Sequence, residues 1–295
     1  MKKRAFFFII LAGVLWGTSG IFVHYLAPYG VTSLQMTMVR GLVSFLCLAI
    51  FALVRDRGLF RVRALDLLYF IGMGVFLFGT ASCYFISMQM TSVSTAVVLM
   101  YTAPLYVMLF SVLFLGERLS HLKLVAFVLM LLGCCLVSGV IGGLRFDAAG
   151  IAIGAASGLC FAAYNILTKL AMQRGARASS ATLYSFLSVA AVGLAFSAPW
   201  ELTVSAARAP AVTLPLLIGL GVVTCTLPYI FYTLAMKELP AGTASALGIV
   251  EPMSATLFSV LLFSEPMNWS SGAGVALILL SVFLLSRAEG KGDRT

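Results

Sequence analysis

Residues 95–117 read TAVVLMYTAPLYVMLFSVLFLGE, and residues 243–265 read TASALGIVEPMSATLFSVLLFSE. At an offset of 148 residues, Pro104 meets Pro252, the run FSVL meets itself and Glu117 meets Glu265. Apolar sequences match by chance at Leu and Ala, but a shared proline followed at the same distance by a shared glutamate indicates an internal repeat. The chain is therefore predicted to contain two copies of one structural unit.

The composition of the whole chain is typical of a membrane protein. Of the 295 residues, 61% are hydrophobic and 10% are charged, and the mean hydropathy is +1.07, whereas about a quarter of the residues of a soluble domain are charged. A bilayer core about 30 Å thick needs about 20 apolar residues per helix, so ten spans leave only short loops. We predict an all-α polytopic membrane protein with no soluble domain. The ten predicted spans lie near residues 5–26, 34–54, 65–87, 93–115, 122–140, 149–172, 181–198, 213–235, 243–263 and 270–286.

The repeat unit is predicted to contain five transmembrane helices. At an offset of 145 residues Gly13 meets Gly158, which extends the match towards the start of the chain, and the predicted units are residues 1–143 and 144–295. Because five is an odd number, the second unit lies in the membrane in the opposite orientation, and the result is a 5+5 inverted-topology repeat. Such repeats suit alternating access around a central site. Glu117 is then expected on the cytoplasmic side and Glu265 outside.

The basic residues lie at the ends of the predicted spans, so the net charge of +9 indicates membrane flanks and not nucleic-acid binding. One side of the membrane collects 16 of the 19 basic residues, and the other collects only Arg145 and Arg208. The positive-inside rule therefore puts both termini in the cytoplasm, and we predict an integral protein of the cytoplasmic membrane. The first apolar segment is too long for the core of a signal peptide, so it is predicted to be the first span.

Two charged residues, Arg40 and Glu251, fall deep inside predicted spans, well away from the span ends. A charge at the bilayer centre costs about 2.5–3.5 kcal/mol on insertion scales, so each side chain is expected to face protein or a water-filled cavity. Helical rise puts their Cα atoms about 9 Å apart in depth, within reach of a long Arg and a Glu side chain. The two either neutralise each other in a packing ion pair, or face opposite ends of a zwitterionic substrate. Glu251 is also a candidate for proton exchange.

Aromatic and hydrogen-bonding side chains accompany these two charges. Ligand pockets are largely apolar with a few polar groups, and aromatic faces also bind cations. A lone Tyr or Asn in a membrane helix is, however, often a structural hydrogen bond between helices. The predicted substrate-binding residues are Trp16, Ser19, Arg40, Tyr84, Tyr101, Asn165, Tyr232 and Glu251.

Pro104 and Pro252 are the predicted helix breaks. Proline lacks the N–H donor and clashes with the carbonyl four residues back, so the carbonyls of Met100 and Gly248 are expected to be free for a ligand, a side chain or water. The alternative is a kink that only shapes helix packing. Interrupted spans at matching positions of two halves are the best sequence indication of a transporter's binding site. A close helix contact is predicted at Gly13, Gly17 and Gly20.

One motif resembles the nucleophile of an intramembrane protease, because residues 17–20 read GTSG, a GxSG pattern. His24 lies about 140° around the same predicted helix from Ser19, and His121 is predicted in a cytoplasmic loop, so neither forms a dyad with that serine. The sequence contains no HExxH and no GxxxxGK[ST] motif, and its cysteines lack the spacing of metal ligands. We predict a protein that is not an enzyme, without catalytic residues, metal or cofactor.

The chain resembles the EamA branch of the drug/metabolite transporter superfamily. The resemblance rests on Leu15-Trp16-Gly17, Arg40-Gly41-Leu42, Ala103-Pro104, Leu115-Gly116-Glu117, Glu251-Pro252 and Ser264-Glu265-Pro266. Ser264 departs from the glycine that is usual before that last glutamate. The resemblance implies a ten-helix fold and movement of small metabolites, often amino acid export. It leaves the substrate open, and Arg40 and Glu251 match positions that recur across the branch, so these two residues can serve the fold instead of selectivity.

We therefore hypothesise a secondary transporter that exports an amino acid or similar zwitterion by alternating access, with protons as a candidate coupling ion. The alternative is an exporter of organic cations or drug-like molecules, with Glu251 as the anionic contact. A more distant alternative is a non-transporting membrane scaffold, which the absence of a predicted soluble domain disfavours. The predicted partners are a small-molecule substrate and the lipid bilayer. The sequence predicts no oligomeric state.

Overall fold

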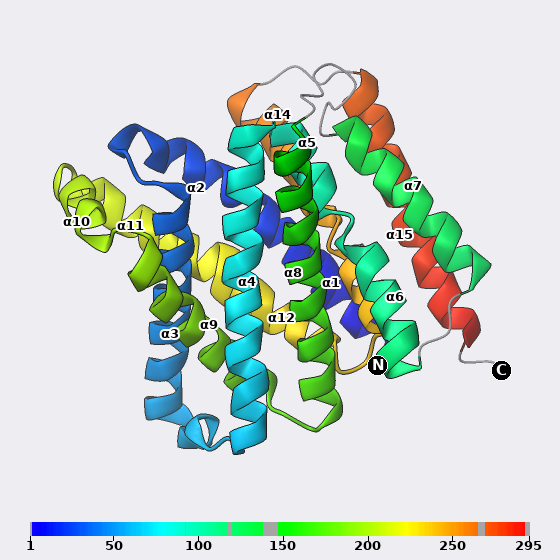
Figure 1. The fold of residues 1–295 in the computed structure, drawn as a ribbon, viewed down its shortest axis with the longest axis horizontal. Helices are drawn as coiled ribbons and strands as arrows, with labels where there is room; N and C mark the ends of the chain where they lie inside the picture. The colour runs from blue at the N-terminus through cyan, green and yellow to red at the C-terminus, as the bar shows by residue number, and fades with distance from the viewer. Residues whose placement is uncertain (1, 92, 117–119, 138–146, 265–268, 293–295) are drawn as a thin grey trace.

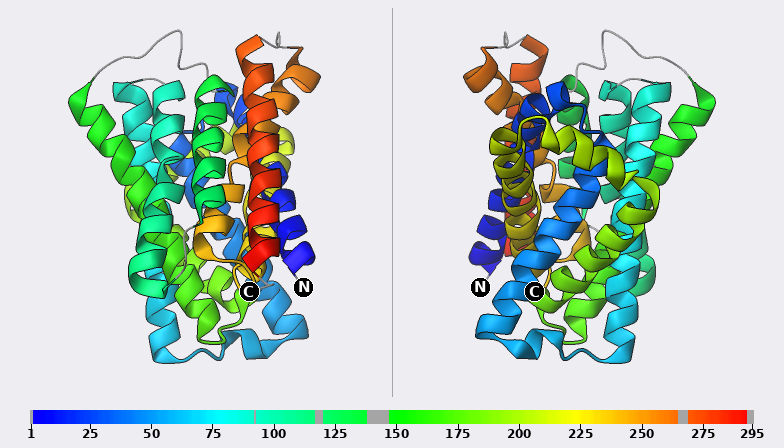
Figure 2. Two further views of the ribbon diagram at one scale, coloured as in Figure 1. Left: turned by 90° about the vertical axis from the view of Figure 1, so that its right-hand side faces the viewer. Right: turned by 90° about the vertical axis from the view of Figure 1, so that its left-hand side faces the viewer.

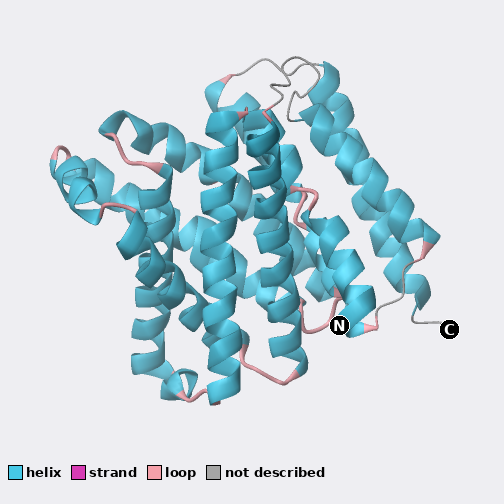
Figure 3. Ribbon diagram, viewed as in Figure 1, coloured by secondary structure: helices cyan, strands magenta, loops and turns pink. Residues whose placement is uncertain are grey.

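The structure is a computed structural model that describes residues 2–91, 93–116, 120–137, 147–264 and 269–292. All secondary structure in these residues is helical (Figures 1 and 3). Glu117 and Glu265, whose sides of the membrane the repeat predicts, lie outside the described residues. The helices of the first half are α1 Lys2–Gly17, α2 Ser19–Leu26, η1 Ala27–Tyr29, α3 Ser33–Arg55, η2 Arg57–Phe60, α4 Ala64–Met90, α5 Val93–Met100, α6 Ala103–Leu115 and α7 His121–Val137. Those of the second half are α8 Ala148–Gln173, α9 Ala178–Phe196, α10 Pro199–Ala207, α11 Pro210–Gly221, η4 Val222–Thr226, α12 Leu227–Ala235, α13 Ala241–Leu247, α14 Val250–Phe263 and α15 Trp269–Gly292.

Eight helical stretches are long and apolar enough to cross a membrane, and two more apolar helices, His121–Val137 and Trp269–Leu285, are shorter. Large apolar side chains are exposed on the outer faces of these helices, for example Val54, Leu113 and Leu261. Exposed apolar surface on this scale is suited to lipid and not to water. The chain is an integral membrane protein. The eight long stretches are Lys3–Tyr29, Ser33–Arg55, Ala64–Met90, Thr95–Leu115, Ala148–Gln173, Ala178–Phe196, Pro210–Ala235 and Ala241–Phe263.

Two spans are interrupted ahead of the paired prolines. α5 ends at Met100 and α6 begins at Ala103, while α13 ends at Leu247 and α14 begins at Val250. Because proline has no N–H to donate, the chain closes short turns there instead of continuing the α-helical ladder. The backbone N–H of Glu251 donates to the carbonyl of Gly248 at 3.0 Å. The expectation that this carbonyl is free is therefore wrong, since the turn itself supplies a donor.

Helices of the first half pack largely on helices of the second half. α4 packs against α8 and α9, α1 packs against α12 and α14, α3 packs against α9, and α7 lies beside α15 at one edge of the molecule (Figures 1 and 2). α3 and α9 run in opposite directions, because Gln35 near the start of α3 donates to the carbonyl of Ala198 beyond the end of α9, at 3.4 Å. At the other end, Asp56 after α3 pairs with Arg177 before α9.

Glycines let α1 approach α14 closely. A Cβ atom on Gly13 would lie 2.9 Å from the Val250 Cβ atom, and one on Gly17 would lie 2.7 Å from the Ser254 Cβ atom. The prediction of a close helix contact is confirmed for these two glycines. It is wrong for Gly20, whose Cβ would meet nothing within 4 Å, because α1 ends at Gly17 and the chain turns at Thr18 before α2 begins.

Candidate functional site

A cavity of about 590 Å³ lies between the two halves of the chain. Its lining runs from Arg40, in the middle of α3, to Ser33 at the start of that helix, and it also includes Met88 near the end of α4 and Val137 at the end of α7. The cavity therefore extends from the middle of the helix bundle towards one end. Residues at the opposite ends of α3 and α4 are not among its lining.

Six of the eight predicted substrate-binding residues line this cavity. They come from both halves of the chain and from five helices, so the fold gathers side chains that are far apart in sequence. Pro252 also lines the cavity, whereas Pro104 is buried at the start of α6 and is not part of the lining. The six residues are Trp16 of α1, Ser19 of α2, Arg40 of α3, Tyr84 of α4, Tyr101 between α5 and α6, and Glu251 of α14.

Arg40 and Glu251 share the cavity without forming an ion pair. No nitrogen of Arg40 lies within 4.0 Å of a carboxylate oxygen among the described residues, and an Nη atom of Arg40 donates instead to the carbonyl of Thr224 at 3.0 Å. Thr224 belongs to η4, a π-helical turn, and such turns interrupt the regular backbone ladder and occur often at functional sites. The simple neutralisation of one charge by the other is thus not the arrangement seen here.

Four buried polar atoms on cavity-lining residues have no hydrogen-bond partner among the described residues. They are Trp16 Nε1, Ser19 Oγ, Arg40 Nε and the Tyr101 hydroxyl oxygen. The indole and guanidinium nitrogens can only donate, while the two hydroxyls can donate or accept. An unpaired buried polar group costs about 1–3 kcal/mol. A set of such groups around one cavity is therefore suited to a ligand or water that supplies acceptors.

An aromatic floor, formed by Trp16, Tyr164, Phe186, Tyr229 and Tyr232, lies at the inner end of the cavity. The Tyr229 ring centroid is 5.0 Å from those of Trp16 and Phe186 and 5.8 Å from that of Tyr164, and the Trp16 and Tyr232 centroids are 5.3 Å apart. These rings are at most 8% exposed. Aromatic pairs at such distances add stability beyond the area they bury, so the floor is a packed layer.

The other two predicted site residues, Asn165 and Tyr232, do not line the cavity. Both are fully buried, the Tyr232 hydroxyl donates to Asn165 Oδ1, and Asn165 Nδ2 donates to the carbonyl of Phe161 at 2.7 Å. Their polar groups are satisfied by each other and by the backbone. In this conformation they connect α8 to α12 through the floor residue Tyr232, and their contact with a substrate stays a prediction.

Most of the cavity wall is formed by apolar residues, which the sequence did not identify as site residues. No sequence signal distinguishes these residues, because similar side chains also cover the lipid-facing surface. A metal site is not indicated either, since no three His, Cys, Asp or Glu side chains gather within the described part of the chain. The apolar and aromatic wall residues include Leu77, Phe85, Met88, Val97, Met100, Phe161, Phe186 and Val189.

Comparison with known proteins identifies the family. The sequence model of the EamA-like transporter family matches residues 3–139 and again residues 148–287. The chain belongs to the EamA-like transporter family. The two matches divide this EamA-like transporter into two repeats, and the family is part of the drug/metabolite transporter superfamily.

Relatives of this EamA-like transporter match it along nearly its whole length. It is 32% identical to an uncharacterized transporter of Archaeoglobus fulgidus, with 95% of each chain covered. It is 28% identical to the uncharacterized transporter YwfM of Bacillus subtilis, with 96% of this chain and 94% of that one covered. A solved crystal structure shares the fold with a TM-score of 0.79 at 19% identity, covering 96% of each chain. The protein is therefore a transporter of the EamA type.

Proposed function

We propose that this transporter moves a small zwitterion, with amino acids as the first candidates, out of the cytoplasm by alternating access. The observation that carries the proposal is the pair of opposite charges, Arg40 and Glu251, that share one cavity without pairing with each other. A carboxylate group of the substrate is matched by the guanidinium and an ammonium group is matched by the carboxylate. The unpaired donors Trp16 Nε1 and Arg40 Nε favour the same kind of ligand, since they require acceptor atoms.

The size and walls of the cavity fit such a substrate. A cavity of about 590 Å³ lies within the range of about 300–1,000 Å³ that is usual for small-molecule sites. The aromatic and aliphatic walls accommodate an apolar side chain of the substrate. Ser19 Oγ has no partner among the described residues, and hence no base to activate it, so we propose transport with no covalent step.

The transport cycle is proposed to use ten spans arranged as two inverted five-helix units, residues 1–143 and 144–295. The antiparallel packing of α3 and α9, which correspond in the repeat, supports this arrangement. With both termini in the cytoplasm, the end of the bundle that holds Ser33 and Met88 faces outside, and the cavity is in its outward-open state. Opening of the cavity to the cytoplasm then requires the packed rings of the aromatic floor to move apart.

An organic-cation exporter is the second candidate, and the aromatic wall favours it. Seven of the residues that line the cavity carry aromatic rings, and Glu251 supplies the one carboxylate of that lining. The seven are Trp16, Tyr84, Phe85, Tyr101, Phe161, Phe186 and Tyr229. Such rings bind quaternary ammonium groups through cation–π contacts. In that case Arg40 has a structural role through its hydrogen bond to the Thr224 carbonyl, and a carboxylate on the substrate contributes nothing to its binding.

A thermal-shift screen of the detergent-purified protein distinguishes the two candidates. A ligand that binds only the folded state stabilises it by RT ln(1 + [L]/Kd). The screen compares each amino acid with its decarboxylated amine and with its deaminated acid. We expect stabilisation by at least one amino acid and by neither of its single-charge analogues. Stabilisation by the amine and by quaternary amines alone overturns the zwitterion proposal in favour of the cation exporter.

A further inference from the structure

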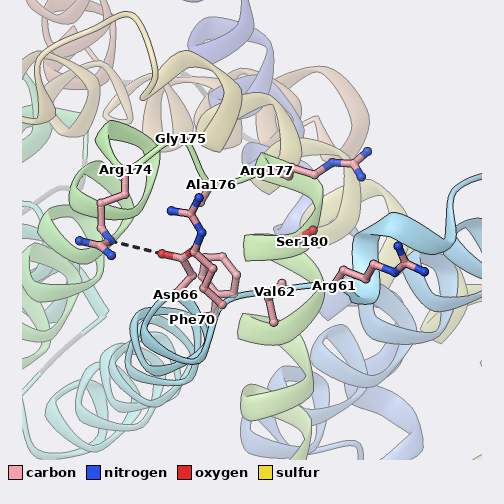
Figure 4. A pocket seen from close by; sticks show the side chains of 10 residues that line it. Arg61, Val62, Asp66, Phe70, Arg174, Gly175, Ala176, Arg177 and Ser180 are labelled. Carbon is pink, nitrogen blue, oxygen red and sulfur yellow. Dashed lines mark hydrogen bonds and ion pairs between the residues drawn. The ribbon is translucent and has the colours of Figure 1, made fainter.

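A second pocket, of about 170 Å³, lies at the end of the bundle opposite to the open end of the cavity. It forms where two connections from different halves of the chain meet: residues 56–63 between α3 and α4, and residues 174–177 between α8 and α9 (Figure 4). Four arginines line it, Arg61 and Arg63 from the first connection and Arg174 and Arg177 from the second.

Neighbouring carboxylates pair with only two of these four arginines. Arg174 Nε donates to Asp66 Oδ1 at 3.3 Å, as the dashed line in Figure 4 marks, and Arg177 is hydrogen-bonded to Asp56. Among the described residues, no carboxylate oxygen lies within 4.0 Å of a nitrogen of the other two arginines. Four arginines beside two carboxylates give this end of the bundle an excess of two positive charges, and in Figure 4 the side chains of Arg61 and Arg177 extend away from Arg174 and Asp66.

Two long helices also begin at this pocket. α4 starts directly after Arg63 and α9 starts directly after Arg177, and neither of these residues caps its helix with a side-chain hydrogen bond. The first N–H groups of a helix have no intrahelical partners and carry the positive end of the helix dipole. They therefore add to the attraction that the arginines exert on an anion. The carboxylate of Asp66 lies in the first turn of α4, but it is engaged by Arg174.

We propose that this pocket binds a phosphate group. Guanidinium groups recognise phosphate through paired, charge-assisted hydrogen bonds, and the excess charge and the helix starts both favour a compact anion. The group comes either from the headgroup of an anionic phospholipid or from a soluble phosphate ester, which present the same chemistry. Basic pockets between membrane helices commonly bind lipid headgroups, and this pocket lies directly beyond the ends of two spans. A bound phosphate bridges the two halves of the transporter at the end where the cavity is closed.

The test measures the melting temperature of the full-length protein in mixed micelles of detergent and phosphatidylcholine. Phosphatidylglycerol is added in one arm and soluble glycerol 3-phosphate in the other. The double variant Arg61→Gln, Arg63→Gln removes the two unpaired arginines, and its fold is expected to persist because both side chains are exposed. Arg208→Gln is the matched control, because Arg208 is an exposed arginine after α10 and outside the pocket lining. A second variant, Arg61→Lys with Arg63→Lys, keeps the charge but not the paired geometry.

We expect one of the two phosphate sources to stabilise the natural protein and the control alike. Stabilisation by phosphatidylglycerol alone identifies a lipid site, and stabilisation by glycerol 3-phosphate identifies a site for soluble phosphate esters. The double Gln variant should bind the same source at least about tenfold more weakly, and the double Lys variant should lie between the two. The proposal is overturned when neither source stabilises the natural protein, or when the double Gln variant responds as strongly as the control. These outcomes are independent of whether amino acids bind in the central cavity.

Discussion

Replacing Gly17 by alanine tests the helix contact on which the cavity is built. A Cβ atom at this position would lie 2.7 Å from the Ser254 Cβ atom, 2.9 Å from the Ala255 nitrogen and 3.0 Å from the Glu251 carbonyl oxygen. The last two atoms belong to the backbone of α14, so no side-chain rotation relieves the contact. Reaching an ordinary separation of 3.4 Å requires α1 and α14 to move apart by about 0.7 Å. Overpacking of this kind typically costs about 1–3 kcal/mol.

Gly20→Ala is the matched control, because a Cβ atom on Gly20 would meet nothing within 4 Å. Both glycines lie at helix ends, Gly17 at the end of α1 and Gly20 at the start of α2, so each exchange gains less than the helix-interior value of about 1 kcal/mol, and this gain largely cancels in their comparison. At about 2 °C per kcal/mol for a chain of this size, the Gly17 variant should melt about 2–6 °C below the Gly20 variant. The assay is thermal unfolding of both purified proteins in the same detergent. Equal melting temperatures would refute the close contact between α1 and α14.

Three further changes address the cavity, the floor and the end opposite to the cavity opening. Glu251→Gln should weaken amino acid binding by about tenfold or more, as expected for loss of a charge-assisted hydrogen bond. It should also abolish pH-dependent flux if this carboxylate couples protons. Unchanged affinity would exclude contact between Glu251 and an ammonium group of the substrate. Tyr232→Phe removes the hydroxyl that donates to Asn165 and should lower the free energy of unfolding by about 1–3 kcal/mol. Denaturant titration measures this difference, and an unchanged free energy would show that the hydrogen bond contributes nothing to stability. The hydrogen bond from Arg177 holds the pKa of Asp56 below its usual value, so the ion pair stabilises the fold at neutral pH and this contribution is lost as pH falls through the folded-state pKa. The difference in melting temperature between the natural protein and Asp56→Asn should accordingly be constant above about pH 5 and shrink below about pH 4, and a constant difference down to pH 3 would contradict this assignment.

The sequence predicted the helices well because bilayer thickness imposes their length. The helical stretches of the structure lie close to the predicted spans, including those interrupted ahead of Pro104 and Pro252. The shared proline was informative because its missing N–H changes the backbone in any environment. The carbonyl of Gly248 was mispredicted for a related reason: a backbone group freed by proline can be satisfied by a short turn nearby, here through the N–H of Glu251, and sequence does not reveal which local turn forms.

The candidate site was only partly predictable. Arg40 and Glu251 stood out because charge inside a span is costly, and the structure puts both at one cavity. Asn165 and Tyr232 stood out as polar side chains inside spans, yet their side chains bond to each other and do not line the cavity. Chemical type predicts that a buried polar group needs a partner, but whether that partner is a ligand or another helix depends on packing. Apolar wall residues such as Phe85 gave no signal, since lipid and ligand favour the same side chains.

The most direct test of the proposed function is uptake of radiolabelled amino acids into proteoliposomes that contain the purified transporter. Empty liposomes and the Glu251→Gln variant serve as controls. We expect saturable uptake of at least one amino acid, inhibited by the same unlabelled amino acid but not by its decarboxylated amine, and strongly reduced in the variant. The absence of saturable amino acid flux, with saturable flux of quaternary amines in the same vesicles, would contradict the assignment of the central cavity to a zwitterion.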